Sequence, residues 1–212
     1  MESKVAADAN APEPGARSAP DDGRDRAPAC STLPSRPTTY AALDLGTNNC
    51  RLLVARPSAD GFRIVDAFSR IVRLGEGVSH SGRLGEPAIA RTLSALAVCR
   101  DKMSSRGVTR FRLIATEACR AAENGPDFLE RVREEVGLRL EVVDRRTEAH
   151  LAAEGCAALA DRQARGVVLF DIGGGSSEIV WLARQRGRET MRQRIRMWGA
   201  LPLRVVPLAE KF

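Results

Sequence analysis

Two places in the sequence combine a short apolar run, an aspartate and a glycine-rich loop. Asp44 ends one such run and precedes Gly46 by two residues, and Asp171 stands in the same relation to Gly173. Short apolar runs of this kind indicate buried strands. A glycine- and hydroxyl-rich loop after a strand exposes several backbone N–H groups together, which suits it to bind phosphate. Each loop could instead be an ordinary turn, for which Asp and Gly are also favoured.

The chemistry expected at these loops is phosphate binding together with a divalent cation. A carboxylate beside a phosphate site makes electrostatic sense if a cation lies between the two, and magnesium is the usual choice. We therefore expect Mg²⁺ as a cofactor, held by Asp44, Asp171 and Glu178, the last on the strand that returns from the second loop. Neither loop is a P-loop, because no lysine lies near either one. The expected phosphate-binding residues of the loops are Gly46, Thr47, Asn48, Gly173, Gly174, Gly175 and Ser176.

Arg120 and Glu148 are the other two candidates for chemistry. Arg120 comes soon after an expected strand, where its guanidinium could bind two phosphate oxygens at once, although it could equally be a surface charge in an arginine-rich chain. Glu148 follows Thr147, which we expect to cap a helix, and the helix dipole favours an ionised carboxylate in the first turn. Taken alone, Glu148 is either a base in a cleft or a charge at the solvated edge of its helix.

The elements that position these residues alternate between strands and helices, which predicts a mixed α/β protein with hairpins before the crossover helices. Asp60-Gly61 is the expected turn of one hairpin, and Pro87 and Gly107 are expected to bound a helix. The expected strands are 40–44, 51–56, 63–73, 111–115, 138–143, 167–171, 177–182 and 190–197, and the expected helices are 87–107, 126–136 and 147–160.

Composition narrows the class of protein. Residues 1–38 hold six of the eleven prolines and almost no apolar periodicity, so we expect this segment to be disordered. The five cysteines are scattered and form no C-x-x-C pair, which favours reduced thiols over a zinc site or a disulfide framework.

No apolar run is long enough to span a membrane, and the N-terminus lacks the apolar core of a secretory signal, so we expect a cytoplasmic protein. The net charge of +6 comes mostly from arginine and is weak evidence for a polyanionic partner; we expect no specific nucleic acid.

Four blocks of sequence, in order, carry a family resemblance. They are Asp44-Leu-Gly-Thr-Asn-Asn49, Ala115-Thr-Glu-Ala-Cys-Arg120, Thr147-Glu-Ala149 and Asp171-Ile-Gly-Gly-Gly-Ser-Ser-Glu178. Together they resemble the exopolyphosphatase/guanosine-pentaphosphate phosphatase (Ppx/GppA) family, from about Tyr40 to the end of the chain. The resemblance implies an actin/hexokinase-like fold of two ribonuclease-H-like domains, here 39–146 and 147–212, with the second incomplete. It implies Glu148 as the base that activates water, and polyphosphate or guanosine pentaphosphate as the substrate. The sequence leaves a homodimer open.

The sequence departs from the family pattern at two points. Thr147 stands where the family has the first Glu of Asn-Glu-Glu-Ala, and Gly46-Thr-Asn-Asn49 replaces the usual Gly-Ser-Asn-Ser. Both changes keep side chains that can form hydrogen bonds. Two other functions stay open at this point: a regulator that binds polyphosphate or a guanosine polyphosphate without hydrolysis, and an actin-like ATPase or sugar kinase.

Overall fold

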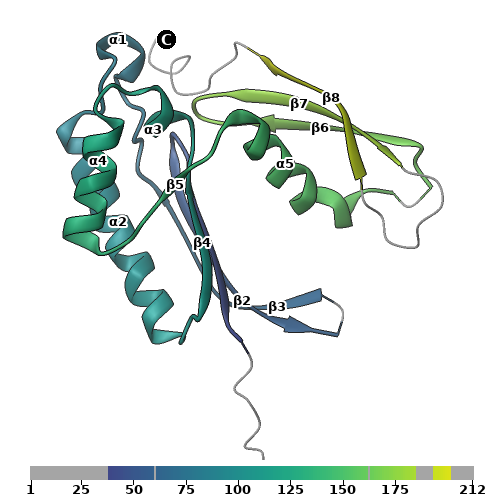
Figure 1. Cartoon of the computed structure of the whole chain (residues 1–212), viewed down its shortest axis with the longest axis horizontal. Coiled ribbons are helices and arrows are strands. Elements are labelled where there is room, and N and C mark those ends of the chain that lie inside the picture. The colour runs from purple at the N-terminus through teal and green to yellow at the C-terminus, as the bar shows by residue number, and fades with distance from the viewer. Residues whose placement is uncertain (1–37, 60, 162, 185–192, 202–212) are drawn as a thin grey trace, which may run out of the picture. The chain divides into compact units, whose positions relative to one another are not determined.

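The computed structural model describes residues 38–59, 61–161, 163–184 and 193–201. A five-stranded mixed sheet forms the first part, in the order β3-β2-β1-β4-β5 (Figure 1). β1 runs antiparallel to β2 and parallel to β4, which places the end of β1 beside the start of β2 at one edge of the sheet. The strands are β1 (Tyr40–Leu45), β2 (Asn49–Ser58), β3 (Gly61–Ile71), β4 (Arg110–Ala115) and β5 (Glu141–Val142).

Alternation along β1 and β2 puts one set of side chains into the core of this sheet. Leu43, Leu45, Leu52 and Val54 are almost fully buried, as expected when every second residue faces the same side. The long helix α2 (Glu86–Ser105) covers that face and contributes Ile89, Leu93, Leu96 and Cys99 among others. It starts with Pro87 in the first turn and is followed by Gly107 at a φ of 60°, where glycine is favoured. Helices α1 (Val78–Ser81), α3 (Glu117–Ala121) and α4 (Gly125–Arg131) complete this part, and α4 continues into a π-helical turn, Val132–Val136.

A second, antiparallel sheet has the order β6-β7-β8. Helix α5 packs on it, with Ala149 and Ala153 against Val180 and Leu182. These small helix residues let α5 approach the sheet closely. Figure 1 shows α5 lying along one face of this sheet. The bounds are α5 (Arg145–Cys156), β6 (Gly166–Ile172), β7 (Ser177–Arg184) and β8 (Gln193–Leu201), with a 3₁₀ turn at Ala157–Leu159.

The observed elements correct several sequence expectations. Thr147 does not cap its helix: Asp144 is the N-cap, and its Oδ1 accepts a hydrogen bond of 2.7 Å from the Thr147 N–H. Only Glu141–Val142 (β5) of the strand expected over 138–143 is a strand in the structure. The short helix α3, which follows β4 directly, was not expected. The expected strand over 190–197 corresponds to β8, which the structure describes from Gln193.

Two expectations about the organisation of the chain remain predictions. The disordered segment expected over 1–38 falls outside the described residues except for Thr38, and the boundary at residue 146 between two domains is untested. None of the helices in the described part of the chain is both long and apolar enough to cross a membrane.

Candidate functional site

The two loops singled out in the sequence have the same backbone geometry. The Gly46 N–H donates to the Asn49 carbonyl at 2.9 Å, and the Gly173 N–H donates to the Ser176 carbonyl at 2.8 Å. Each bond closes a four-residue turn between the two strands of a hairpin. Within the described part of the chain, the N–H groups between these ends, at residues 47–48 and 174–175, donate to no backbone carbonyl. Such groups are available to an anion.

The two loops lie against each other. A Cβ built on Gly175 would lie 2.2 Å from Thr47 Oγ1, so a side chain does not fit there without movement. Beside this contact is a polar cavity of about 250 Å³. The cavity therefore has both expected phosphate-binding loops in its wall. Its lining residues are Asp44, Gly46, Thr47, Asn48, Asn49, Arg51, Thr116, Glu148, Asp171, Ile172, Gly173, Gly174, Gly175 and Ser176.

Three carboxylates line this cavity, Asp44, Glu148 and Asp171, and the surroundings of Asp44 and Glu148 disfavour the charged forms of those two. Burial raises the pKa of Asp44 above its usual value, with a further rise from the charge of Asp171 and a partial offset from Arg51. Burial also raises the pKa of Glu148 to about 6; Arg120 lowers it, and the charges of Glu178 and Asp44 raise it. Carboxylates that repel one another and are shielded from water attract cations. The cavity wall thus carries concentrated negative charge.

Glu178 lies behind the cavity rather than in its wall. It is the direct cross-strand partner of Asp171, so both side chains project from the same face of the β6–β7 hairpin. Glu178 is only 3% exposed, and its Oε1 has no hydrogen-bond partner among the described residues. Burial raises the pKa of Glu178, and a hydrogen bond with Ser176 lowers it by a smaller amount. A buried carboxylate oxygen without a partner is costly, and a bound cation is one group that could satisfy it.

This arrangement fits a magnesium ion. Asp44, Asp171 and Glu178 offer only carboxylate oxygens, the ligands that Mg²⁺ prefers. Among the described residues no three His, Cys, Asp or Glu side chains are close enough to hold a metal by themselves. Magnesium does not need such a cage, since it is usually held by one or two carboxylates, by water and by the phosphates of the substrate. The ligand roles of the three carboxylates stay predictions.

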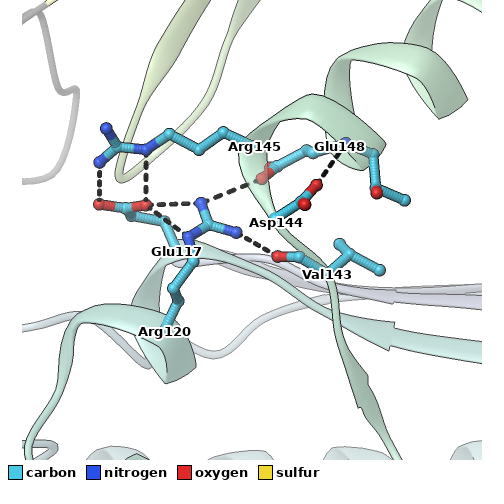
Figure 2. A network of polar contacts seen from close by, with 7 residues as sticks. Glu117, Arg120, Val143, Asp144, Arg145 and Glu148 are labelled. Carbon is cyan, nitrogen blue, oxygen red and sulfur yellow. Dashed lines mark hydrogen bonds and ion pairs between the residues drawn. The ribbon is translucent and has the colours of Figure 1, made fainter.

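Glu148 is held by a network of charged side chains (Figure 2). Arg120 Nη2 donates to Glu148 Oε2 at 3.2 Å and to Glu117 Oε2 at 2.6 Å, while Nη1 donates to the Val143 carbonyl. Arg145 binds the same Glu117, with Nη2 2.8 Å from Oε1. The guanidinium expected to bind phosphate is thus engaged by carboxylates and does not line the cavity. Its phosphate-binding role stays a prediction.

Sequence reasoning did not single out Arg51, Glu117 or Arg145, which lie at or near this site. Arg51 lines the cavity and is the cross-strand partner of Asp44, a pairing that only the register of the β1–β2 hairpin reveals. Glu117 and Arg120 form an ion pair three residues apart on α3, a spacing the sequence displays. The link from Glu117 to Arg145, 28 residues away, has no local signal.

Comparisons with known proteins identify the family of the chain. Residues 53–211 match the model of the Ppx/GppA phosphatase family. A Mycobacterium tuberculosis protein named exopolyphosphatase 2 is 37% identical over 152 residues, which are 68% of this chain and 48% of that protein. The chain therefore spans about half the length of the curated relatives it matches.

Solved structures show the same fold. An Aquifex aeolicus Ppx/GppA enzyme aligns with a TM-score of 0.68 and 33% identity, over 84% of this chain and 56% of that one. An exopolyphosphatase from Cytophaga hutchinsonii aligns with a TM-score of 0.73 and 25% identity, over 82% of this chain and 54% of that one. These likenesses confirm the α/β, actin/hexokinase-like fold class expected from the sequence.

Proposed function

Because the chain belongs to the Ppx/GppA phosphatase family, we propose that it supplies the catalytic loops of a magnesium-dependent exophosphatase. The substrate would be inorganic polyphosphate, from which the enzyme removes the terminal phosphoryl group. The same chemistry applies to the 5′-terminal phosphate of guanosine pentaphosphate, which is the alternative substrate. The observation that carries the proposal is that both loops line one polar cavity together with Asp44, Asp171 and Glu148.

The residues at the cavity would have different roles in phosphoryl transfer. The N–H groups at residues 47–48 and 174–175, which donate to no backbone carbonyl of the described residues, would bind the phosphate oxygens and stabilise the negative charge that spreads over them. Asp44, Asp171 and Glu178 would hold Mg²⁺, which neutralises part of that charge when bound. Both loops therefore position the terminal phosphoryl group for in-line attack.

Glu148 would orient the attacking water and accept its proton on a carboxylate oxygen. Its pKa of about 6 suits this task, because the carboxylate is ionised near neutral pH and is still basic enough to accept a proton. Water attacks the terminal phosphorus, the bridging P–O bond breaks, and the products are orthophosphate and a chain one unit shorter.

A cytoplasmic location and a homodimer belong to the same proposal. The described cysteines are free thiols, which agrees with a reducing compartment.

Phosphate release tests this proposal directly. The purified protein is incubated with polyphosphate, with guanosine pentaphosphate and with ATP, each with Mg²⁺ and with chelator. Magnesium-dependent release from polyphosphate or guanosine pentaphosphate supports the proposal. Polyphosphate bound and recovered intact would favour a non-hydrolytic regulator, and hydrolysis of ATP alone would favour an actin-like ATPase.

A further inference from the structure

Glu117 is a buried carboxylate outside the cavity wall that binds two arginines at once. Its side chain is 8% exposed. Arg120 donates from Nε and Nη2 to Oε2, at 3.2 and 2.6 Å, and Arg145 donates from Nη2 to Oε1 at 2.8 Å. Both oxygens of Glu117 are therefore used, and Figure 2 shows the carboxylate between the two guanidinium groups.

We propose that Glu117 is a positioning residue for Glu148: it fixes the guanidinium of Arg120, which in turn holds the Glu148 carboxylate at the cavity wall. This inference rests on the proposed function, since the value of a fixed Glu148 is its contact with the attacking water. Glu117 itself is placed too far back to line the cavity.

The geometry of Arg120 explains why Glu117 is needed. A guanidinium is planar and its donors have fixed directions, so bonds at two of its corners fix where the third points. Glu117 engages Nε and Nη2, and the Val143 carbonyl engages Nη1. The direction of the remaining Nη2 donor, toward Glu148 Oε2 at 3.2 Å, is then determined. Without Glu117, Arg120 keeps its bond to Val143 but can turn about it.

Charge balance supports the same role. Burial acts to raise the pKa of Glu117, but its bonds with Arg145 and Arg120 prevail and hold that pKa below its usual value, so Glu117 is ionised near neutral pH. Glu117 and Glu148 together balance Arg120 and Arg145. If Glu117 were neutral, two neighbouring guanidinium groups would share one carboxylate, and their repulsion would move the side chains.

Glu117 also joins the elements that carry the site. Glu117 and Arg120 belong to α3, which follows β4, whereas Arg145 and Glu148 belong to the first turn of α5. A Cβ on Gly175 would lie 3.1 Å from Glu117 Cγ, so the glycine-rich loop packs against the stem of the same residue. Glu117 is the point where α3, α5 and the second phosphate loop meet.

The test uses a double-mutant cycle, which measures whether two residues act through each other. Glu117→Gln keeps the shape of the side chain and removes its charge. We expect it to lower kcat for polyphosphate about tenfold or more, because misplacement of a catalytic group by about 1 Å can cost up to about 100-fold. KM should change by less than about threefold, and in the Glu148→Gln background the same change should lower kcat by less than about twofold.

Two companion variants guard against loss of folding. Glu141→Gln is the matched control, because Glu141 also binds an arginine through two hydrogen bonds but is exposed and does not contact Glu148. It should leave kcat unchanged. Arg145→Lys keeps the positive charge but loses the planar guanidinium group. It should also lower kcat with little change in KM, by a smaller factor than Glu117→Gln does. If Glu117→Gln does not fold, Arg145→Lys decides the question by the same criteria.

A readout without catalysis separates this inference from the proposed function. The side-chain carboxyl ¹³C resonance of Glu148 should move at fixed pH in Glu117→Gln and stay in place in Glu141→Gln. A shifted resonance in a protein that hydrolyses nothing would remove the proposed function and keep the positioning role. Three results would overturn the positioning role alone. They are an unmoved Glu148 resonance in a Glu117→Gln protein with normal hydrolysis, an unchanged kcat in Glu117→Gln, and an equal loss of kcat when Glu117→Gln is made in the parent and in Glu148→Gln.

Discussion

The acid limb of the pH–rate profile is the most specific test of Glu148. Burial raises the pKa of this carboxyl from 4.5 to about 6. The general base must be deprotonated to accept a proton from water, so activity is present above pH 6 and is lost as the pH falls through that value. Glu148→Gln removes the base while keeping nearly the same shape.

The size of the effect follows from the fraction of Glu148 that is ionised. With a pKa of about 6 in the free protein, roughly 90% of the carboxyl is ionised at pH 7 and roughly 10% at pH 5, so kcat/KM should fall about tenfold over that range. At an ordinary pKa the ionised fraction at pH 5 would still be about three quarters, and kcat/KM would fall less than about 1.5-fold. In Glu148→Gln, kcat at pH 7 should be lower by about 10²–10⁴-fold.

The assay is phosphate release between pH 4.5 and 8 over a range of polyphosphate concentrations at fixed Mg²⁺, so that kcat/KM and kcat are obtained separately. Glu154→Gln is the control, since Glu154 is an exposed carboxylate on the same helix α5. Binding of polyphosphate to Glu148→Gln, measured by calorimetry, should stay close to that of the parent. A Gln variant whose kcat is within a few-fold of the parent, or which keeps an acid limb near pH 6, would refute Glu148 as the base.

Three further variants test the loops, the metal site and the core. Gly175→Ala places a methyl group 2.2 Å from Thr47 Oγ1, which should push the loops apart and weaken polyphosphate binding about tenfold or more in calorimetry. Asp171→Asn removes a charge from the expected metal site, so the Mg²⁺ concentration for half-maximal activity should rise several-fold in a metal titration. Phe128→Ala truncates a core side chain that is 1% exposed, and urea unfolding should show a loss of about 3–5 kcal/mol.

Each of these has a control and a result that would count against it. Gly155→Ala is the control for Gly175→Ala, because a Cβ built on Gly155, which lies within a helix, meets no atom within 4 Å. This variant should raise the free energy of unfolding by about 0.5–1 kcal/mol and leave polyphosphate binding unchanged. Equal binding in Gly175→Ala and the parent would show that the loop contact is not needed. An unchanged metal midpoint in Asp171→Asn would exclude that carboxylate as a ligand. A loss below about 1 kcal/mol for Phe128→Ala would mean that the core collapses into the gap.

The loops were predictable from sequence because their signal is local. An apolar strand, an aspartate and a glycine within a few residues specify a hairpin turn, in which the Gly46 N–H donates to the Asn49 carbonyl and the Gly173 N–H to the Ser176 carbonyl. The start of α5 was harder, because Asp144 and Thr147 are both good N-cap residues three positions apart. The Asp144 carboxylate accepts the Thr147 N–H, so the helix starts earlier, and Glu148 still falls in its first turn.

The partners of the charged residues were not predictable in the same way. Arg120 was expected to bind phosphate because it follows a strand, yet two of its contacts, with Glu148 and the Val143 carbonyl, come from residues 28 and 23 positions later in the chain. No periodicity within α3 or α5 specifies which of many arginines meets which carboxylate. That choice depends on how the helices pack, which is decided by apolar residues elsewhere.

The charges around the cavity give the strongest argument for magnesium. Asp44, Glu148 and Asp171 line it, with Glu178 behind them, and Arg51 is the cation in its described lining. The overall charge of +6 lies elsewhere and does not offset this local excess of carboxylates. A polyanionic phosphate chain would be repelled from such a wall at close range. In the proposed site the loops would favour phosphate while the carboxylates oppose it, and a divalent cation between them would resolve the conflict by binding both.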